Sequence, residues 1–449
     1  MTTSRRCLFS AATLAIFLSA AIAVSHAQTY TDLFNFDTIH GATPTSPGIL
    51  AQGRDGNLYG TAPISREGGV VFSFTTGGFP KVLHNFVRTD GQRPYSGLTM
   101  GTDGDFYGTT FLGGTENLGT VFKIAANGTL TTLHNFTKAD GITETPPIQA
   151  ADGDFFGTTA TTAYRVAPSG GFTSLPSLYG ASPANPLFQA TDGNLYGTTG
   201  DGGSSNHGTV FKMTTEGTVT VIFNFDAHVP GQGSTLMQGN DGNFYGTTYE
   251  GGDNKFGTVF KLTPRGVATA LHSFSDPNYP NDGAYPVAGL LQASDGNFYG
   301  VTVEGGSNGH GVIFEITPAG DYSILYNFEA ATGNNPESTP IQHTNGKIYG
   351  LTEGGGTNGV GVAYSFDLGL PPFARLLPVI GKVGEVVEIL GQGFTGTTAV
   401  SFNGTAAAFN VASDTYLTAT VPTGATSGIV SVTTPSGVLN SNQSFQVKP

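Results

Sequence analysis

A short motif that recurs along most of the chain constrains its fold more than any other feature. The motif is a turn followed by an aromatic strand residue and a glycine, as in Asp241-Gly-Asn-Phe-Tyr245-Gly246. A chain that repeats one unit at a steady spacing builds an array of similar structural modules. Seven copies occur 40 to 54 residues apart, with their central aromatic residues at Tyr59, Tyr107, Phe156, Tyr196, Tyr245, Tyr299 and Tyr349.

Two further signatures also occur seven times each. One is an apolar strand after a Gly-rich loop, as in Thr258-Val259-Phe260, and the other is a strand such as Leu271-His272-Ser273-Phe274. The Asp-Gly and Asn-Gly dipeptides suit tight hairpins, and no helical period of apolar residues occurs after the N-terminal segment. Units of four antiparallel strands at this spacing predict an all-β, seven-bladed β-propeller. In the second unit the four strand signals lie at Gly97–Met100, Asp105–Phe111, Thr120–Ile124 and Leu130–Phe136.

The phase of the repeats predicts how such a ring closes. The array opens with a fourth-strand signature, Leu33–Phe36, and ends with a third-strand signature near Val362–Phe366. The last blade therefore needs the N-terminal strand as its outer strand, which would also remove an exposed sheet edge.

The N-terminus has the pattern of a secretory signal peptide. Arg5 and Arg6 precede an apolar run over residues 8–24, and Ser25-His26-Ala27 resembles a cleavage site. We expect residues 1–27 to be removed and the protein to be secreted, or held in the periplasm or at the cell surface. The general secretory and twin-arginine routes both stay open. The single cysteine, Cys7, lies in the removed part, so no disulfide is expected.

The segment 369–449 predicts a small immunoglobulin-like β-sandwich. The segment Leu370-Pro371-Pro372 ends the repeats as a linker, and short alternating strands with Gly and Pro turns follow. The segment resembles an IPT/TIG domain through Gly391-Gln-Gly-Phe394, Phe402-Asn-Gly404 and Val421-Pro422. The resemblance implies a spacer or carbohydrate-associated module in an exported protein.

The repeats, expected over residues 28–368, resemble the GloVer-type tandem repeat family of exported bacterial proteins. The stretches that carry the resemblance include Asp241-Gly-Asn-Phe-Tyr-Gly-Thr-Thr248, Gly251-Gly252 and Gly257-Thr-Val-Phe-Lys261. The third unit departs from the pattern, since it has no Gly-Gly loop and no usual fourth-strand sequence. The resemblance implies a repeat scaffold and no general activity.

The charge of the chain narrows the classes of partner. Lys and Arg number only 18 against 32 Asp and Glu, giving a formal charge of −14. Nucleic acid is therefore not expected as a partner, because its phosphates need clustered basic residues. The sequence also predicts no cofactor, no metal site, no catalytic residues, no membrane span in the mature chain and a monomer.

The candidate site is the ring face that carries the long loops, where an acidic residue recurs before the Gly pair. One interpretation is a polar groove for a ligand, and the other is a set of solvated loop tips. The candidate ligand-binding residues are Asp201, Asn206, His207, Glu250, Asp253, Asn254, Glu304, Asn308, His310, Glu353 and Asn358.

Three functions are compatible with these features. A non-enzymatic binding or structural protein whose long-loop face recognises a glycan or a protein is favoured, because the chain is rich in scaffold motifs and poor in catalytic ones. The alternative is an extracellular glycan hydrolase or lyase that uses paired loop carboxylates. A sensor domain is the third.

Overall fold

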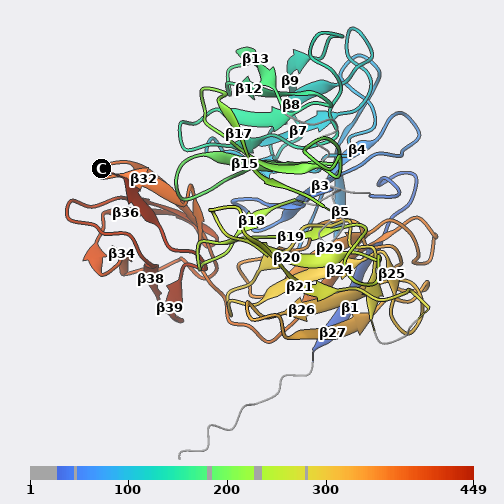
Figure 1. Cartoon of the computed structure of the whole chain (residues 1–449). Helices are drawn as coiled ribbons and strands as arrows, with labels where there is room; N and C mark the ends of the chain where they lie inside the picture. The colour runs from blue at the N-terminus through green and yellow to red at the C-terminus, as the bar shows by residue number, and fades with distance from the viewer. Residues whose placement is uncertain (1–27, 45–47, 179–184, 227–234, 279–281, 449) are drawn as a thin grey trace, which may run out of the picture.

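The computed structural model describes residues 28–44, 48–178, 185–226, 235–278 and 282–448. Within these ranges the regular elements are all β-strands. Figure 1 shows the repeats as one body, coloured blue to orange, with the C-terminal domain in red beside it. The predicted signal peptide lies outside the described residues. In the part of the chain that the structure describes, no helix has the length and hydropathy of a membrane span.

The first four repeat sheets are four-stranded and antiparallel, and their strands pair in sequence order. Sheet 1 comprises β2 (Ala51–Gln52), β3 (Leu58–Ala62), β4 (Val70–Phe74) and β5 (Pro80–Asn85). Sheet 2 comprises β6 (Thr99–Met100), β7 (Phe106–Thr110), β8 (Thr120–Ile124) and β9 (Leu130–Asn135). Sheet 3 comprises β10 (Ile148–Gln149), β11 (Phe155–Thr158), β12 (Thr162–Val166) and β13 (Phe172–Ser177). Sheet 4 comprises β14 (Phe188–Gln189), β15 (Leu195–Thr199), β16 (Thr209–Met213) and β17 (Val219–Asn224).

Three more sheets of the same kind follow in the described residues. Sheet 5 comprises β18 (Met237–Gln238), β19 (Phe244–Thr248), β20 (Thr258–Leu262) and β21 (Ala268–Ser273). Sheet 6 comprises β23 (Leu291–Gln292), β24 (Phe298–Thr302), β26 (Val312–Ile316) and β27 (Tyr322–Asn327). Sheet 7 comprises β28 (Ile341–Gln342), β29 (Ile348–Thr352), β30 (Val362–Asp367) and β1 (Thr29–Asn35). Two short strands, β22 (Gly283–Ala284) and β25 (Glu304–Gly305), pair between loops.

The N-terminal strand completes the last sheet, as the repeat phase predicts. Strand β1 pairs antiparallel with β30, from Thr29 opposite Asp367 to Asn35 opposite Val362. The third unit also forms a fourth strand, β13, although its sequence departs from the other repeats there.

A glutamine on the first strand of most sheets bonds that sheet to its neighbour. The Oε1 atom of Gln149, for example, accepts a hydrogen bond of 2.8 Å from the backbone N–H of Thr102 in sheet 2. Sheet 2 has Met100 at this position, and there the Arg54 side chain donates to the carbonyl of Thr102 instead. Each sheet is thus joined to the next in sequence order, in a propeller-like arrangement. The other glutamines that make this bond are Gln52, Gln189, Gln238, Gln292 and Gln342.

The recurring aromatic–glycine pair is explained by packing within and between sheets. Tyr245 is fully buried, and its ring lies 4.1 Å from that of Phe298 in the next sheet. The glycine after the aromatic residue faces a ring on the third strand. A Cβ at Gly300 would lie 2.4 Å from the Phe314 ring, so a larger residue cannot be accommodated without displacement.

The turn aspartates hold the tight hairpins together. Asp241 accepts a hydrogen bond from the N–H of Asn243 and another, of 2.8 Å, from the hydroxyl of Tyr245. Both contacts recur in other repeats, for example between Asp55 and Tyr59. These aspartates are therefore structural.

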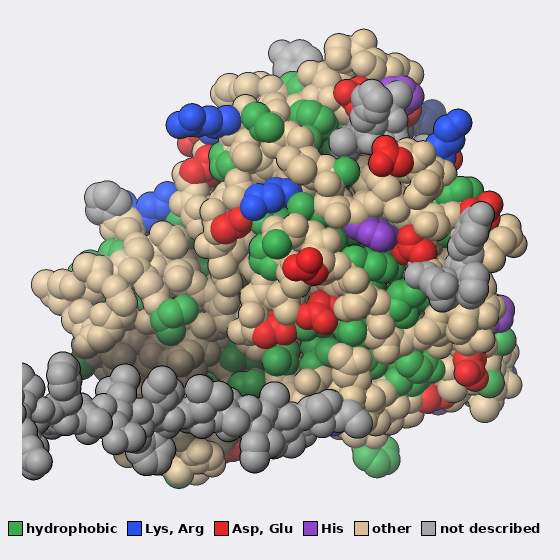
Figure 2. Space-filling view, turned by 60° about the horizontal axis from the view of Figure 1, so that its bottom comes forward, with side chains coloured by type: hydrophobic (Ala, Val, Ile, Leu, Met, Phe, Trp, Pro, Cys, Tyr) green, Lys and Arg blue, Asp and Glu red, His purple; other side chains and the backbone are tan. Residues whose placement is uncertain are grey.

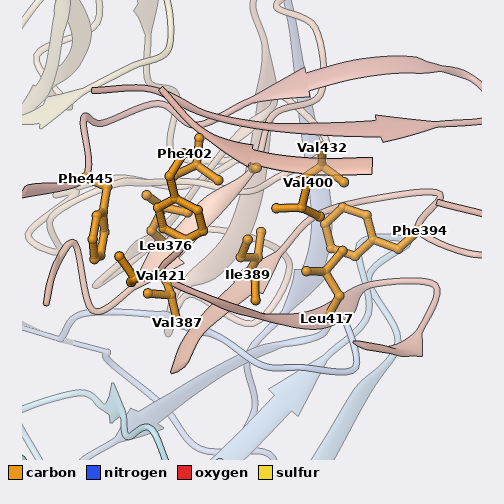
Figure 3. Close-up of a cluster of buried hydrophobic side chains, with 13 residues drawn as sticks. Leu376, Val387, Ile389, Phe394, Val400, Phe402, Leu417, Val421, Val432 and Phe445 are labelled. Atoms are coloured by element: carbon orange, nitrogen blue, oxygen red, sulfur yellow. The ribbon is translucent and has the colours of Figure 1, made fainter. Parts of the chain in front are cut away.

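The C-terminal domain is a two-sheet sandwich, as predicted. One sheet has the order β31-β33-β37-β36, the other β35-β34-β38-β39, and β32 pairs parallel with β40. Its apolar core, which includes Ile389, Phe402 and Phe445, is shown in Figure 3. The strands are β31 (Arg375–Leu377), β32 (Ile380–Lys382), β33 (Val386–Leu390), β34 (Ala399–Phe402), β35 (Thr405–Ala406), β36 (Phe409–Ser413), β37 (Tyr416–Thr420), β38 (Val430–Thr434), β39 (Gly437–Asn440) and β40 (Gln446–Lys448).

This domain packs against the face of the repeat sheets that carries the tight turns. The Arg54 guanidinium forms an ion pair with Glu388 and lies 4.6 Å from the centre of the Tyr416 ring. The hydroxyl of Thr415 donates a hydrogen bond of 2.6 Å to the carbonyl of Arg54. At sheet 7, Thr344 accepts a hydrogen bond from the Gln392 side chain. The turn face is therefore partly covered, and the long loops lie at the other face.

Candidate functional site

The acidic candidates follow directly after the second strands of the last four sheets. Asp201, Glu250 and Glu304 have exposed side chains, and Glu353 is half-buried. A threonine at the end of the strand fixes the backbone at Asp201, Glu250 and Glu304; Thr248 Oγ1, for example, donates a hydrogen bond of 2.8 Å to the carbonyl of Glu250. In the last sheet the equivalent bond goes to the carbonyl of Gly354, so Glu353 lies one position earlier in its loop than the other three. The strand ends thus position the carboxylates on the surface.

The asparagine candidates have structural contacts in the loops. The side-chain nitrogen of Asn358 donates a hydrogen bond of 2.8 Å to the carbonyl of Phe36, and that of Asn308 donates one of 3.1 Å to the carbonyl of Phe328. Asn254 makes a longer contact of the same kind, and the Asn206 side chain accepts from a loop N–H. The amides of Asn358, Asn308 and Asn254 hold the loop to the end of a strand, and that of Asn206 bonds within its own loop.

The remaining candidates lie at loop tips. Asp253 and His207 are exposed, and His310 is half-buried. Figure 2 shows acidic side chains scattered over the surface in view, with uncharged groups between them. The described residues contain no group of three or more His, Cys, Asp or Glu side chains that could hold a metal ion.

Two of the predicted carboxylates lie around an aromatic cluster that the repeat pattern did not reveal. The ring of Tyr285 lies 5.0 Å from that of Tyr249 and 5.5 Å from that of Phe256, and all three residues are half-buried. Burial, followed by the nearby charges of Glu304 and Glu250, raises the pKa of Tyr285. We call these five residues the Tyr285 cluster.

The backbone holds Tyr285 in a conformation that is unusual for a residue with a side chain. Its φ angle is 58°. Its N–H donates a hydrogen bond to the carbonyl of Phe256, and its carbonyl accepts one from the N–H of Val303. Strands β22 and β25 pair Ala284 with Glu304, which places the tyrosine beside that carboxylate. Residues held this way often belong to functional surfaces.

The same conformation recurs at equivalent loops with other side chains. Thr43, Arg93 and Asn335 also have positive φ angles, and each precedes a proline, as Tyr285 does. The loop is thus a common frame that presents a different side chain in each of these four repeats. Sequence reasoning missed Tyr285 because the residue lies outside all three repeated signatures, although its place before Pro286 could have marked it.

The fold and this loop face define an all-β repeat protein of propeller-like architecture with a small C-terminal sandwich domain. The Gloeobacter/Verrucomicrobia repeat matches residues 21–186, 65–240, 159–290 and 232–379, and the chain belongs to this family. Residues 372–447 match the IPT/TIG domain.

Solved structures share the fold at low sequence identity. A streptogramin B lyase superposes with a TM-score of 0.55 at 15% identity, over 76% of this chain and 99% of its own. A catalytically inactive virginiamycin B lyase from Staphylococcus aureus with quinupristin gives 0.55 at 14%, over 76% and 99%. A fungal alcohol oxidase of the AA5 family, in complex with copper, gives 0.51 at 13%, over 94% and 100%. Sequence identities this low show that these structures share the fold of this chain and nothing more. A comparison with curated proteins finds no match.

Proposed function

We propose that this chain is an exported, non-enzymatic binding protein whose long-loop face recognises an extracellular glycan. The N-terminal sequence pattern supports export, with a mature chain that begins after residue 27. We also propose that the repeats over residues 28–368 form a closed, seven-bladed propeller and that residues 369–449 are the sandwich. The bond between Gln52 and Thr344 supports closure, because it joins the first and last sheets as other neighbours are joined.

The observation that carries the proposal is the Tyr285 cluster. The apolar face of a sugar ring packs on aromatic rings, while carboxylate oxygens accept hydrogen bonds from its hydroxyls. Tyr249 and Tyr285 offer two half-buried rings 5.0 Å apart, and Glu250 and Glu304 stand exposed at their side. The four side chains together suit a sugar better than a purely charged or purely apolar ligand.

The alternative, a glycan hydrolase or lyase, needs more than this cluster offers. Glycosidases place two carboxyl groups about 5–10 Å apart across the bond, and burial raises the pKa of the one that acts as an acid. Glu250 and Glu304 are exposed, which favours recognition over catalysis. The lyase activity named for the similar structures is not transferred, because the likeness extends to the fold alone.

A glycan array with the mature protein tests the proposal. Tyr285→Asn is the sharpest variant, because Asn335 already occupies the equivalent position with a positive φ angle. We expect the variant to weaken binding about tenfold, since it removes one stacking ring. Glu250→Gln and Glu304→Gln should also weaken binding, and Asp201→Asn, at the equivalent exposed position of sheet 4, is the matched control.

Two outcomes would count against glycan recognition by this face. One is an array without any bound glycan, in which case a protein ligand becomes the better candidate. The other is release of reducing sugar from a polysaccharide that Glu250→Gln or Glu304→Gln abolishes, which would establish the hydrolase instead.

A further inference from the structure

A cavity of about 690 Å³ lies where the first strands of the sheets meet the C-terminal domain. Six of those strands line it, together with the segment that leads into β2, so the cavity lies on the central axis of the ring. Residues 375–380 of the C-terminal domain lie at its other side. Its volume suits a small organic ligand.

Most side chains around this cavity are apolar. Ring residues that line it include Met100, Ile148, Phe188, Met237, Leu291 and Ile341. The glutamines of the repeat sheets among its lining residues are occupied by bonds between sheets and to turn carbonyls; Gln189, for example, accepts a hydrogen bond from the N–H of Ala151 and donates one to the carbonyl of Gly193. The ring side of the cavity therefore has little polar capacity left for a ligand.

On the side of the C-terminal domain, the charged residues among those that line the cavity are Arg375 and Glu385. Arg375 lies on β31, where it pairs with Leu390 of β33, and its half-buried side chain lines the cavity. Among the residues that the structure describes, none forms a hydrogen bond or ion pair with its guanidinium. Glu385 also lines the cavity, but it is exposed and its Oε2 accepts a hydrogen bond of 2.8 Å from the N–H of Lys382.

An arginine in such surroundings is costly unless an anion accompanies it. A guanidinium stays protonated and carries five N–H donors that match a carboxylate in a two-point contact. Burial, with no offsetting contribution, lowers the pKa of Arg375. By contrast, Arg54 at the same domain boundary has its own carboxylate in Glu388.

We propose that this cavity binds a small organic anion, a carboxylate with an apolar body, whose charged end pairs with Arg375. The apolar body would lie against Met100, Phe188, Met237 and their neighbours. The site is separate from the Tyr285 cluster, because it lies at the turn face and is completed by the C-terminal domain. The proposal therefore does not rest on glycan recognition.

Titration calorimetry on the full mature chain, with decanoate as the probe, tests this assignment. Decanoate should bind, and 1-decanol, which has the same chain without the charge, should bind at least about tenfold more weakly. Arg375→Met keeps the length of the side chain and removes its charge, so we expect decanoate binding to fall about 10- to 100-fold. Arg375→Lys keeps the charge and loses the two-point contact, so its affinity for decanoate should lie between those of the unmodified protein and of Arg375→Met.

The controls separate this site from the proposed glycan site. Tyr285→Asn should bind decanoate as the unmodified protein does, whatever the glycan array shows. The comparison of decanoate with decanol needs no variant, so it stays decisive even where Arg375→Met fails to fold. Absence of decanoate binding, equal binding of decanol, or undiminished binding to a folded Arg375→Met variant would each overturn the proposal.

Discussion

The side-chain carbonyl of Gln52 in sheet 1 accepts a hydrogen bond of 3.1 Å from the backbone N–H of Thr344 in sheet 7. The Gln52 side-chain amide also donates a hydrogen bond of 2.8 Å to the hydroxyl of Thr344, and Gln52 is only 2% exposed. The two residues are 292 positions apart, yet the first of these bonds matches those between sequential sheets.

Gln52→Met should therefore weaken the contact between the first and last sheets. Methionine fits the position, since Met100 occupies its equivalent in sheet 2, so the change removes hydrogen bonds with little change in packing. We expect the free energy of unfolding to fall by about 1–2 kcal/mol in a urea titration. An unchanged transition would mean that this bond adds nothing to the stability of the ring.

Tyr245→Ala should destabilise the fold strongly, because it removes a fully buried ring that packs on Phe298. The expected loss is about 3–5 kcal/mol in the free energy of unfolding. Tyr245→Phe keeps the ring and loses only the hydrogen bond to Asp241, so it should cost about 1 kcal/mol. Equal losses in the two variants would contradict a packing role for the ring.

Removing the hydroxyl groups of two buried tyrosines should raise the stability of the fold. The hydroxyls of Tyr164 and Tyr364 have no hydrogen-bond partner among the described residues, and both side chains are fully buried. Phenylalanine occupies the equivalent third-strand position in the other sheets. Tyr164→Phe and Tyr364→Phe should raise the melting temperature, since an unsatisfied buried hydroxyl costs about 1–3 kcal/mol.

The reverse change provides the matched control for that prediction. Phe260→Tyr places a hydroxyl at the same position of sheet 5, where Phe260 is fully buried, and should lower the melting temperature. A stabilising Phe260→Tyr would show that the position can satisfy a hydroxyl after all.

His343 should make the stability of the protein depend on pH. Burial lowers its pKa below the ordinary value of 6.5, and its Nδ1 already accepts a hydrogen bond from Asn345 while Nε2 faces the carbonyl of Gly56. Below pH 6.5 the unfolded chain binds a proton that the folded chain resists. Stability contributed by the neutral ring is therefore present above that pH and is lost as the pH falls.

His343→Ala isolates this contribution, because other repeats have alanine or glycine at the same position. Chemical denaturation at about pH 7.5 and about pH 5 should show a smaller loss of stability in the variant than in the unmodified protein. The same loss in both proteins would assign the pH dependence to groups other than His343.

Much of the fold could be predicted from the repeats, because each strand and turn is encoded within a few residues of itself. The aspartate turns, the buried tyrosines and the pairing of β1 with β30 all follow from local patterns and their phase. The contact of Arg54 with Glu388 could not be predicted in this way. It joins a turn residue to a strand residue of another domain, and neither position carries a repeated signal.

The candidate site was only partly accessible to such reasoning. The acidic residues follow a repeated strand, so their common face could be predicted. The Tyr285 cluster depends on a loop that pairs with another loop through β22 and β25, which no periodic pattern reports. Arg375 lies in a segment where the sequence pattern indicates only a strand of the C-terminal domain.

The pairing of β1 with β30 has a consequence for the order of assembly. During synthesis or translocation from the N-terminus, the strand that emerges first has to wait for its partner until residue 367 is available. Until then the edge of the incomplete array stays open to other chains, which is a hazard for proteins built from sheets. We therefore expect the final, cooperative gain of stability to come only with the last repeat, and chains that stop short of it to aggregate.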